Sequence, residues 1–409
     1  MHEKHPNSRS VSGVEPELLP VGAGDLLGFA ELLTDAERAA LVRLRSFLED
    51  RAQPVLAEHW EAGTSPAFLR DEFAAGDFVH PRELREAGEP VRPLFNGFRN
   101  LELSRTDGSL AILIGGQIGM FNTLMRVGLP AERYAKLRED IENFRMTGCF
   151  ALTEPDHGSD IAGGLSTTAH RQHDTWVLNG EKRWIGNAAL SEYAVVPARD
   201  KADGEVKAFL VRTDSPGFGL RDIEGKTAVR MVRNAHIRLH NVQVSEAARL
   251  PGITSFKDLN RAFRELRPDV VWNAVGLQAG IYERTLNYTA QRHQFGRPIA
   301  GFQLVQEKLV RMLGNLSGSL GMAVRLAQIA AGETVDDGQA ALAKTWVCDR
   351  MRETAALGRE ILGGNGLLLE HDVARFHADA EALYTFEGTH EMNSLIAGRA
   401  ITGLSAFLR

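Results

Sequence analysis

The 409-residue sequence is 44% hydrophobic and 24% charged, as in an ordinary globular protein, and its net charge of −6 argues against nucleic-acid binding, which usually needs a basic excess. Two cysteines, Cys149 and Cys348, are too few for a disulfide framework and predict a reducing compartment such as the cytoplasm. No apolar run reaches the roughly 18 residues of a membrane span, because the best one, 110–121, is short and interrupted by glycines.

The first third of the chain is predicted to be mostly helical. Residues 1–30 carry scattered proline, glycine and serine and lack the apolar segment of a secretory signal, so we expect a disordered or loosely packed tail. Thr34 and Glu37 then fit a capping box at the start of a helix. These patterns predict an all-α domain over 31–148. Its other helices are expected at 68–75, 109–127 and 131–143.

Near residue 149 the pattern changes to short β-like runs separated by turn residues. The run 176–178 (WVL) is followed by Asn179-Gly180, a dipeptide suited to a tight hairpin turn, so we expect a hairpin there. We assign 149–257 to a β domain whose sheet is barrel-like. Further strands are expected around 193–196, 208–211 and 236–239.

Helical periodicity returns from about residue 258 and continues to the end of the sequence. We therefore expect a C-terminal four-helix bundle over 258–409. The fold class is α+β, mainly α, in the order α domain, β domain, α-bundle. The bundle helices are expected near 268–292, 302–331, 336–362 and 388–407.

Five short motifs resemble those of the acyl-CoA dehydrogenase family in order and spacing. Within the family, the closing run 398–403 (GRAITG) is similar to glutaryl-CoA dehydrogenases. The runs 184–187 (WIGN) and 357–360 (LGRE) are similar to short-chain acyl-CoA oxidases. The five motifs are 151–160 (ALTEPDHGSD), 182–187 (KRWIGN), 292–299 (RHQFGRPI), 362–366 (LGGNG) and 386–390 (FEGTH) with Gly398-Arg399.

The resemblance implies a flavoenzyme that removes a proton from Cα and a hydride from Cβ of an acyl-CoA thioester, with Glu387 as the catalytic base. A carboxylate can do this in a dry pocket, because desolvation raises its proton affinity toward the working pH. Position alone would favour an acid stabilised at a helix start, with Thr389 as the N-cap. The motif around Glu387 favours the base.

The resemblance also implies FAD as the cofactor. Trp184 and Ile185 would cover one face of the flavin, and Gly186 stands where dehydrogenases usually have threonine or serine, as in oxidase-like members. The fingerprint Gly-x-Gly-x-x-Gly of a Rossmann flavin site is absent. The residues assigned to the flavin and its surroundings are Phe150, Leu152, Thr153, Ser159, Trp184, Ile185, Gly186, Thr389 and Glu391.

The ADP half of FAD is expected to be bound by residues of a neighbouring subunit in a homotetramer. Arg292 suits the pyrophosphate, because a guanidinium can bond two oxygens at once. Phe295 and Gln303 match adenine contacts, while Gly363 and Gly364 allow a close backbone approach. For Arg292 alone, a solvated arginine at a helix end would be the default interpretation.

A short or medium neutral acyl chain is the expected substrate. Glutaryl-CoA dehydrogenases carry an arginine for the distal carboxylate in the helix that corresponds to 107–114, where this chain has no cation. A carboxylate without a partner in an apolar pocket would be costly. Arg264, which replaces a commonly acidic residue, could face a phosphate or an acidic carrier protein, although an exposed surface arginine is the more frequent case. The substrate residues are Ser159, Phe263, Arg264, Arg267, Gly388 and Arg399, and none is assigned to a metal.

Several alternatives remain open. The electron acceptor is either an electron-transfer flavoprotein or O₂, and Gly186 favours an acyl-CoA oxidase. The thioester is carried by CoA or by an acyl carrier protein. Glu387 argues against members that oxidise nitrogen compounds, and the acidic chain argues against a flavin-bearing nucleic-acid-binding protein.

Overall fold

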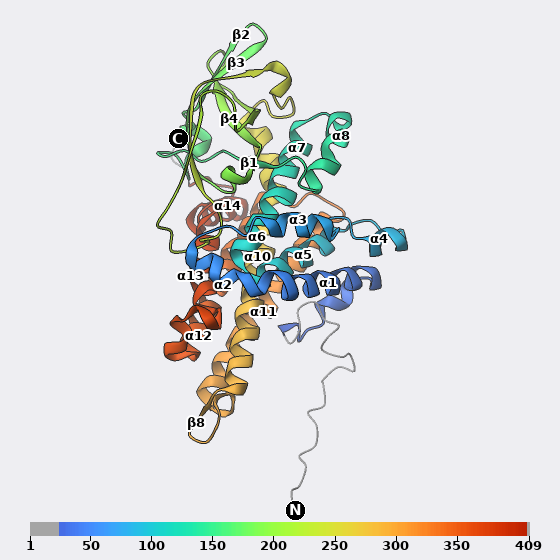
Figure 1. The fold of residues 1–409 in the computed structure, drawn as a ribbon, viewed down its shortest axis with the longest axis vertical. Coiled ribbons are helices and arrows are strands. Elements are labelled where there is room, and N and C mark those ends of the chain that lie inside the picture. Colours follow the sequence, from blue (N-terminus) through green and yellow to red (C-terminus); the bar gives the residue numbers. More distant parts are fainter. Residues whose placement is uncertain (1–23, 407–409) are drawn as a thin grey trace, which may run out of the picture.

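The computed structural model describes residues 24–406, which begin with a helical domain (blue to teal in Figure 1). The predicted capping box is confirmed, since Thr34 Oγ1 accepts from Glu37 N–H at 3.2 Å and Glu37 Oε2 accepts from Thr34 N–H at 3.0 Å. Most of the predicted tail, 1–23, lies outside the described residues. The helices are η3 (Phe29–Leu32), α1 (Asp35–Phe47), η4 (Leu48–Ala52), α2 (Gln53–Ala62), α3 (Phe68–Ala75), α4 (Arg82–Ala87), α5 (Pro93–Thr106), α6 (Gly108–Gly115), η5 (Gly116–Phe121), α7 (Asn122–Gly128) and α8 (Ala131–Glu142).

The predicted helix over 109–127 is confirmed as one apolar stretch, Gly108–Gly128, made of α6, the π-helical segment η5 and α7. Its length and hydropathy would allow a membrane span, but 50% of its most apolar window is buried inside the fold. Gln117 in η5 anchors the next domain, because its Nε2 donates to the Met146 carbonyl at 2.8 Å and its Oε1 accepts from Gly148 N–H at 2.9 Å.

The middle of the chain forms a curled seven-stranded sheet (green to yellow in Figure 1), which confirms the predicted β domain. The strand order is β1-β4-β2-β3-β7-β6, and β5 pairs with β4 off this path. Trp176, Leu178, Phe209 and Ile237 belong to its buried core. The elements are β1 (Gly148–Phe150), α9 (Ile161–Gly164), β2 (Thr168–Gln172), β3 (Thr175–Ile185), η6 (Ala188–Leu190), β4 (Tyr193–Asp200), β5 (Val206–Arg212), β6 (Phe218–Asp222), β7 (Ala235–Ser245) and η7 (Glu246–Ala248).

The prediction of a hairpin turn at Asn179-Gly180 is wrong. Both residues lie inside β3, and the chain turns earlier, between β2 and β3, where His173 has a positive φ of 55°. Gly180 has φ 151° at a shift in the β3–β7 register, and a Cβ built on it would lie 2.5 Å from Thr167 Oγ1. The glycine therefore permits a close approach to Thr167 and does not make a turn.

The C-terminal part is a bundle of long helices, as predicted. The first helix begins at Phe256, earlier than the expected 268, and continues through Pro268. The prediction also missed α13, whose short pattern lies between two motifs. The elements are α10 (Phe256–Gln291), β8 (His293–Gln294), β9 (Arg297–Pro298), η8 (Ile299–Gly301), α11 (Gln303–Ala330), α12 (Asp337–Ile361), η9 (Gly363–Leu367), η10 (Leu369–His371), α13 (Val373–Thr385) and α14 (His390–Thr402).

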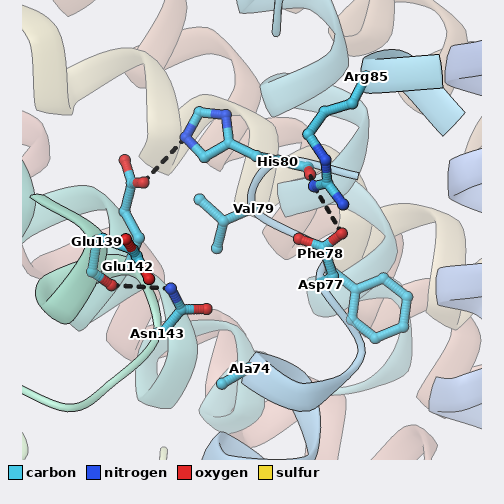
Figure 2. Close-up of a pocket in the computed structure, with 9 residues that line it drawn as sticks. All are labelled: Ala74, Asp77, Phe78, Val79, His80, Arg85, Glu139, Glu142 and Asn143. Atoms are coloured by element: carbon cyan, nitrogen blue, oxygen red, sulfur yellow. Dashed lines mark hydrogen bonds and ion pairs between the residues drawn. The ribbon is translucent and has the colours of Figure 1, made fainter. Parts of the chain in front are cut away.

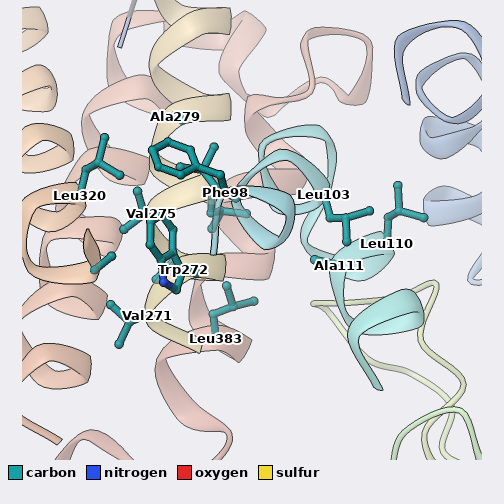
Figure 3. Close-up of a cluster of buried hydrophobic side chains, with 14 of the residues drawn as sticks. Phe98, Leu103, Leu110, Ala111, Val271, Trp272, Val275, Ala279, Leu320 and Leu383 are labelled. Carbon is teal, nitrogen blue, oxygen red and sulfur yellow. The ribbon is translucent and has the colours of Figure 1, made fainter. Parts of the chain in front are cut away.

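The first domain packs on the bundle through a close crossing of α5 and α10. A Cβ built on Gly276 would lie 2.3 Å from the Leu101 carbonyl oxygen, so the two backbones nearly touch. Around this crossing, Phe98 and Trp272 pack with ring centroids 5.2 Å apart, inside the apolar core drawn in Figure 3. The helix that leads to Glu387, α13, is thereby held against a rigid core.

A buried carboxyl on α13 joins all three parts of the chain. Asp379 Oδ1 accepts from Trp60 Nε1 at 3.0 Å and from Val229 N–H at 2.6 Å, and Oδ2 accepts from Ser109 Oγ at 3.2 Å. These donors come from α2, from the segment before β7 and from α6. We call these four residues the Asp379 joint.

Candidate functional site

Glu387 lies in the short bend between α13 and α14. Its φ is 54° and that of Gly388 is 90°, so two consecutive residues adopt left-handed backbone. Such a conformation is uncommon for a residue other than glycine and persists only where the surroundings impose it. Thr389 follows as the N-cap of α14, with Oγ1 accepting from Met392 N–H at 3.3 Å, which confirms the predicted cap. The bend thus sets the direction of Glu387 independently of either helix.

Two buried polar side chains hold this bend. Lys344 on α12 is 1% exposed, and its Nζ donates to the carbonyl oxygens of Phe386 and Gly388. Asn393 on α14 donates from Nδ2 to the Gly388 carbonyl at 2.8 Å. The carbonyls on both sides of Glu387 are therefore fixed.

Glu387 has the electrostatic character of a base. Burial among protein atoms raises its pKa to about 7, Lys344 and Arg267 oppose the rise, and the Asp269 carboxyl adds to it. The residue as a whole is nevertheless exposed, so the site is open to a ligand. Burial also raises the pKa of Asp269 to about 6, and Asn100 Nδ2 donates to its Oδ1 at 3.0 Å. A carboxyl that is half ionised near neutral pH and still accessible is suited to accept a proton.

The motifs at 151–160 and 182–187 lie side by side in the β domain. A buried ion pair joins them, with Lys182 Nζ 2.8 Å from Glu154 Oε1, and the same ammonium donates to the Leu152 carbonyl at 3.1 Å. Arg183 N–H donates to the Thr153 carbonyl at 2.8 Å. The N–H groups of Leu152 and Thr153 donate to no protein acceptor within the described ranges.

Trp184 is the last but one residue of β3, has a positive φ of 65° and is 52% exposed. Ile185 beside it is buried. A Cβ built on Gly186 would meet Val232 at 3.5 Å, an ordinary contact, so there is space for a Cβ at this position. The absence of a hydroxyl at Gly186 is thus not imposed by packing.

Two aromatic rings connect this domain to α10. Phe150 and Phe263, assigned from sequence to flavin and substrate, lie with centroids 6.1 Å apart. Arg264 and Arg267 follow on α10 and share one carboxylate, Asp337, with Arg264 Nε 3.3 Å from it. Ser159, Glu391 and Arg399 are exposed.

Other assigned residues lie far from Glu387 in the same chain. The β8–β9 hairpin is at the end of the molecule opposite the sheet (Figure 1), and Phe295 on it is 95% exposed. Arg292 and Gln303 flank this hairpin, both exposed, and Arg292 makes no ion pair within residues 24–406. Positions Gly363 and Gly364 are open to the surroundings. One chain therefore does not bring all assigned cofactor residues together.

The residues present fit a flavin dinucleotide. An exposed indole can cover an aromatic ring, and two unpartnered backbone N–H groups can donate to its carbonyls. The unpaired Arg292 suits a phosphate.

A small hollow lies elsewhere, between α8 and the segment before α4 (Figure 2). Its polar groups pair with each other: His80 Nε2 lies 3.0 Å from Glu142 Oε2, and Arg85 Nη1 lies 2.7 Å from Asp77 Oδ2. None of the assigned site residues lines it.

The sequence interpretation missed Lys344, Asp269 and Asn393. Lys344 did carry a signal, since it interrupts the apolar face of a helix between Ala340 and Val347. Asp269 follows directly after the matched pair Arg267-Pro268 but has no pattern of its own.

The sequence matches the models "Acyl-CoA dehydrogenase, middle domain" over 149–242 and "Acyl-CoA dehydrogenase, C-terminal domain" over 256–402. The human mitochondrial short-chain specific acyl-CoA dehydrogenase is 33% identical over 373 residues, which cover 89% of this chain and 89% of that protein. Glutaryl-CoA dehydrogenase from Mycobacterium smegmatis has a similar crystal structure, with a TM-score of 0.87, 34% identity, and coverage of 94% of this chain and 99% of that one. A structure of a glutaryl-CoA dehydrogenase from the same organism in complex with FADH2 gives a TM-score of 0.87 and 31% identity, with coverage of 95% and 99%.

Proposed function

Because the chain belongs to the acyl-CoA dehydrogenase family of FAD-dependent oxidoreductases that act on CH–CH groups, we propose that it desaturates a short- or medium-chain acyl-CoA with Glu387 as the base. The observation that carries this proposal is the Glu387 bend: a carboxyl whose pKa burial raises to about 7, held on left-handed backbone. FAD, when bound, supplies the acceptor for the hydride from Cβ.

Glu387 contributes two groups to the reaction. Its carboxylate takes the α proton, and its own backbone N–H makes no hydrogen bond to any described residue. That N–H is therefore free to donate to the thioester oxygen, where negative charge develops as the proton leaves. Lys344 and Asn393 hold the peptide groups around it, so the donor does not need to reorganise.

The acyl group is proposed to be neutral. Arg105, the arginine nearest to the helix expected to line the acyl chain, is buried among the carboxylates of Glu102 and Glu283 at 3.0 and 2.8 Å. It therefore has no capacity left for a substrate carboxylate. The helix itself, α6, has no cation. A dicarboxylate substrate would lack a partner and is disfavoured.

Two arginines on α10 bear on the carrier of the thioester, and Gly186 bears on the electron acceptor. Arg264 and Arg267 lie one turn apart on α10 and both contact Asp337. We propose that they pair with phosphates of CoA. An acyl carrier protein is the alternative carrier. An electron-transfer flavoprotein is the proposed acceptor. O₂ is the alternative, which Gly186 favours because it replaces the threonine or serine that dehydrogenases usually have at this position.

We also propose a cytoplasmic homotetramer in which Arg292, Phe295, Gln303, Gly363 and Gly364 bind the FAD of a neighbouring subunit. The hairpin and adjacent helix faces carry exposed apolar side chains that an interface would cover. On the hairpin and on α11, which follows it, these are Phe295, Leu304 and Val310, while Leu342 and Trp346 are exposed on α12 on either side of Lys344. Both cysteines are free and buried, as suits a reducing compartment.

The replacement Glu387→Gln tests the base. It should leave a yellow, FAD-loaded protein whose flavin is bleached by acyl-CoA under anaerobic conditions at least about a hundredfold more slowly. Glu381→Gln, an exposed acid on α13, is the matched control and should keep the parent rate. Near-normal bleaching in Glu387→Gln would refute the assignment. Acyl-CoAs of graded length and carrier-protein thioesters used in the same assay identify the substrate.

Peroxide formed per turnover in air separates the two acceptors. A near-stoichiometric yield would establish the oxidase and reject the dehydrogenase. Gly186→Ser should fold with unchanged stability, because the site has space for a Cβ. A lower peroxide yield in that variant would connect the glycine to the reaction with O₂.

A further inference from the structure

Lys344 is a buried lysine on an otherwise apolar helix face. Ala340, Val347 and Cys348, about one turn away on either side, are all buried. An ammonium in this position is costly unless its donors are satisfied. A methionine would fill similar space without that cost, so packing alone does not explain a lysine here.

The partners of Lys344 are the two carbonyls that bracket Glu387. Phe386 is the C-cap of α13, and carbonyls at a helix C-terminus carry partial negative charge that favours a cation. The Gly388 carbonyl receives a second donor from Asn393 at 2.8 Å. One ammonium therefore holds the chain immediately before and after the left-handed residue.

The charge of Lys344 also acts on Glu387. Burial raises the pKa of Glu387, and Lys344 is the largest of the influences that oppose the rise, followed by Arg267, while Asp269 works in the other direction. Burial lowers the pKa of Lys344 itself, Cys348 and Glu387 oppose that fall, and Arg267 adds to it. Burial raises the pKa of the Cys348 thiol to about 11, so this neighbour is neutral at the working pH. The ammonium is thus the main group that keeps Glu387 ionisable near neutral pH.

We propose that Lys344 is the positioning residue of the base, fixing the bend that carries Glu387 and holding its carboxyl in the ionised form. This inference rests on the proposed role of Glu387.

The test uses Lys344→Met in the FAD-loaded enzyme. The rate of anaerobic flavin reduction is measured from about pH 6 to 9, with the acyl-CoA that reduces the flavin of the parent enzyme fastest. The midpoint of the pH profile should rise by on the order of one unit, a loss of about tenfold in rate on the acid side. The plateau should fall by a further factor of up to about a hundred, because the base is displaced.

Two variants separate positioning from packing. Cys348→Ala truncates a buried side chain one turn along the same helix and should leave the pH midpoint unchanged. Lys344→Arg keeps the charge but not the geometry, so its midpoint should stay near that of the parent while its plateau falls. The double variant Lys344→Met/Glu387→Gln should be no slower than Glu387→Gln alone, since Lys344 acts through Glu387.

An unchanged midpoint and plateau in Lys344→Met would overturn the proposal, as would an additive loss in the double variant. If Lys344→Met does not accumulate as folded protein, a parent-like plateau in Lys344→Arg would overturn it. Near-normal turnover by Glu387→Gln would instead overturn the proposed function, so the two failures are distinguishable.

Discussion

Asp269 places a second carboxyl in the surroundings of Glu387. It lies near the start of α10, accepts a hydrogen bond from Asn100, and its charge raises the pKa of Glu387. The charge of Arg99, a fully buried arginine, in turn lowers the pKa of Asp269. Asp269 therefore links the proton affinity of the base to a charge in the first domain.

We predict that Asp269→Asn lowers the pKa of Glu387, because a like charge is removed. The acid limb of the flavin-reduction profile should move to lower pH, with a rate gain of up to about tenfold on that limb. The melting temperature should fall as well, since Arg99 loses the carboxyl that offsets its charge. An acid limb that does not move would show that the two carboxyls are not coupled.

Among single residues, the sequence identifies those whose role depends only on neighbours in the chain. Thr34 and Thr389 are recognisable as caps because a cap depends on residues within one turn. Lys344 interrupts an apolar helix face, which marks it as unusual, but the partners that give Lys344 its role lie 42 and 44 positions along the chain, and Asp269 has no pattern of its own. The assignment of Glu387 depended on its motif, and the site residues as a set stay predictions.

Secondary-structure elements were predictable where periodicity is long. The helices 68–75 and 131–143 and the capped α1 agree with the structure to within one or two residues. Asn179-Gly180 resembles a turn dipeptide in sequence, so a hairpin is predicted there. Its glycine is needed because Thr167 packs closely against it, which is a tertiary contact that the local sequence does not reveal. The helix expected near 268–292 begins earlier, at Phe256, and continues through Pro268.

The crossing of α5 and α10 provides a prediction at this scale. Gly276→Ala should destabilise the protein by about 1–3 kcal/mol or more, because the added Cβ meets a backbone carbonyl that cannot move aside. Gly314→Ala, on α11 with open space around it, is the matched control and should be neutral or stabilising by up to about 1 kcal/mol. Thermal unfolding of both variants checks this, and equal stabilities would contradict the close crossing.

For the whole molecule, the predicted order of α domain, β domain and α-bundle is confirmed. The contacts of the Asp379 joint, which lock these parts together, could not be predicted, because each joins residues more than a hundred positions apart. In the Asp379 joint, burial raises the pKa of Asp379 to about 7, and the Asp107 carboxyl adds to the rise while Arg375 opposes it.

This joint makes stability depend on pH. The folded state keeps a proton on Asp379 between its ordinary pKa of 3.8 and about 7, whereas the unfolded chain releases it. Stability should therefore fall as pH rises through that window, by at most about 1.4 kcal/mol per pH unit. Asp379→Asn should flatten the slope of melting temperature against pH, and Glu387→Gln and Asp269→Asn measure the shares due to two other carboxyls whose pKa values burial raises. A slope that Asp379→Asn leaves intact would assign the proton to another group.

The position of the β8–β9 hairpin has a consequence for how the enzyme keeps its flavin. In the proposed assembly, the hairpin of one subunit completes the dinucleotide site of another, so no subunit can hold FAD by itself. The fraction of FAD released on dilution, seen as loss of the yellow colour, would then depend on the dissociation of the subunits as well as on the affinity for FAD. Added flavin would promote association to the same extent that association promotes flavin binding.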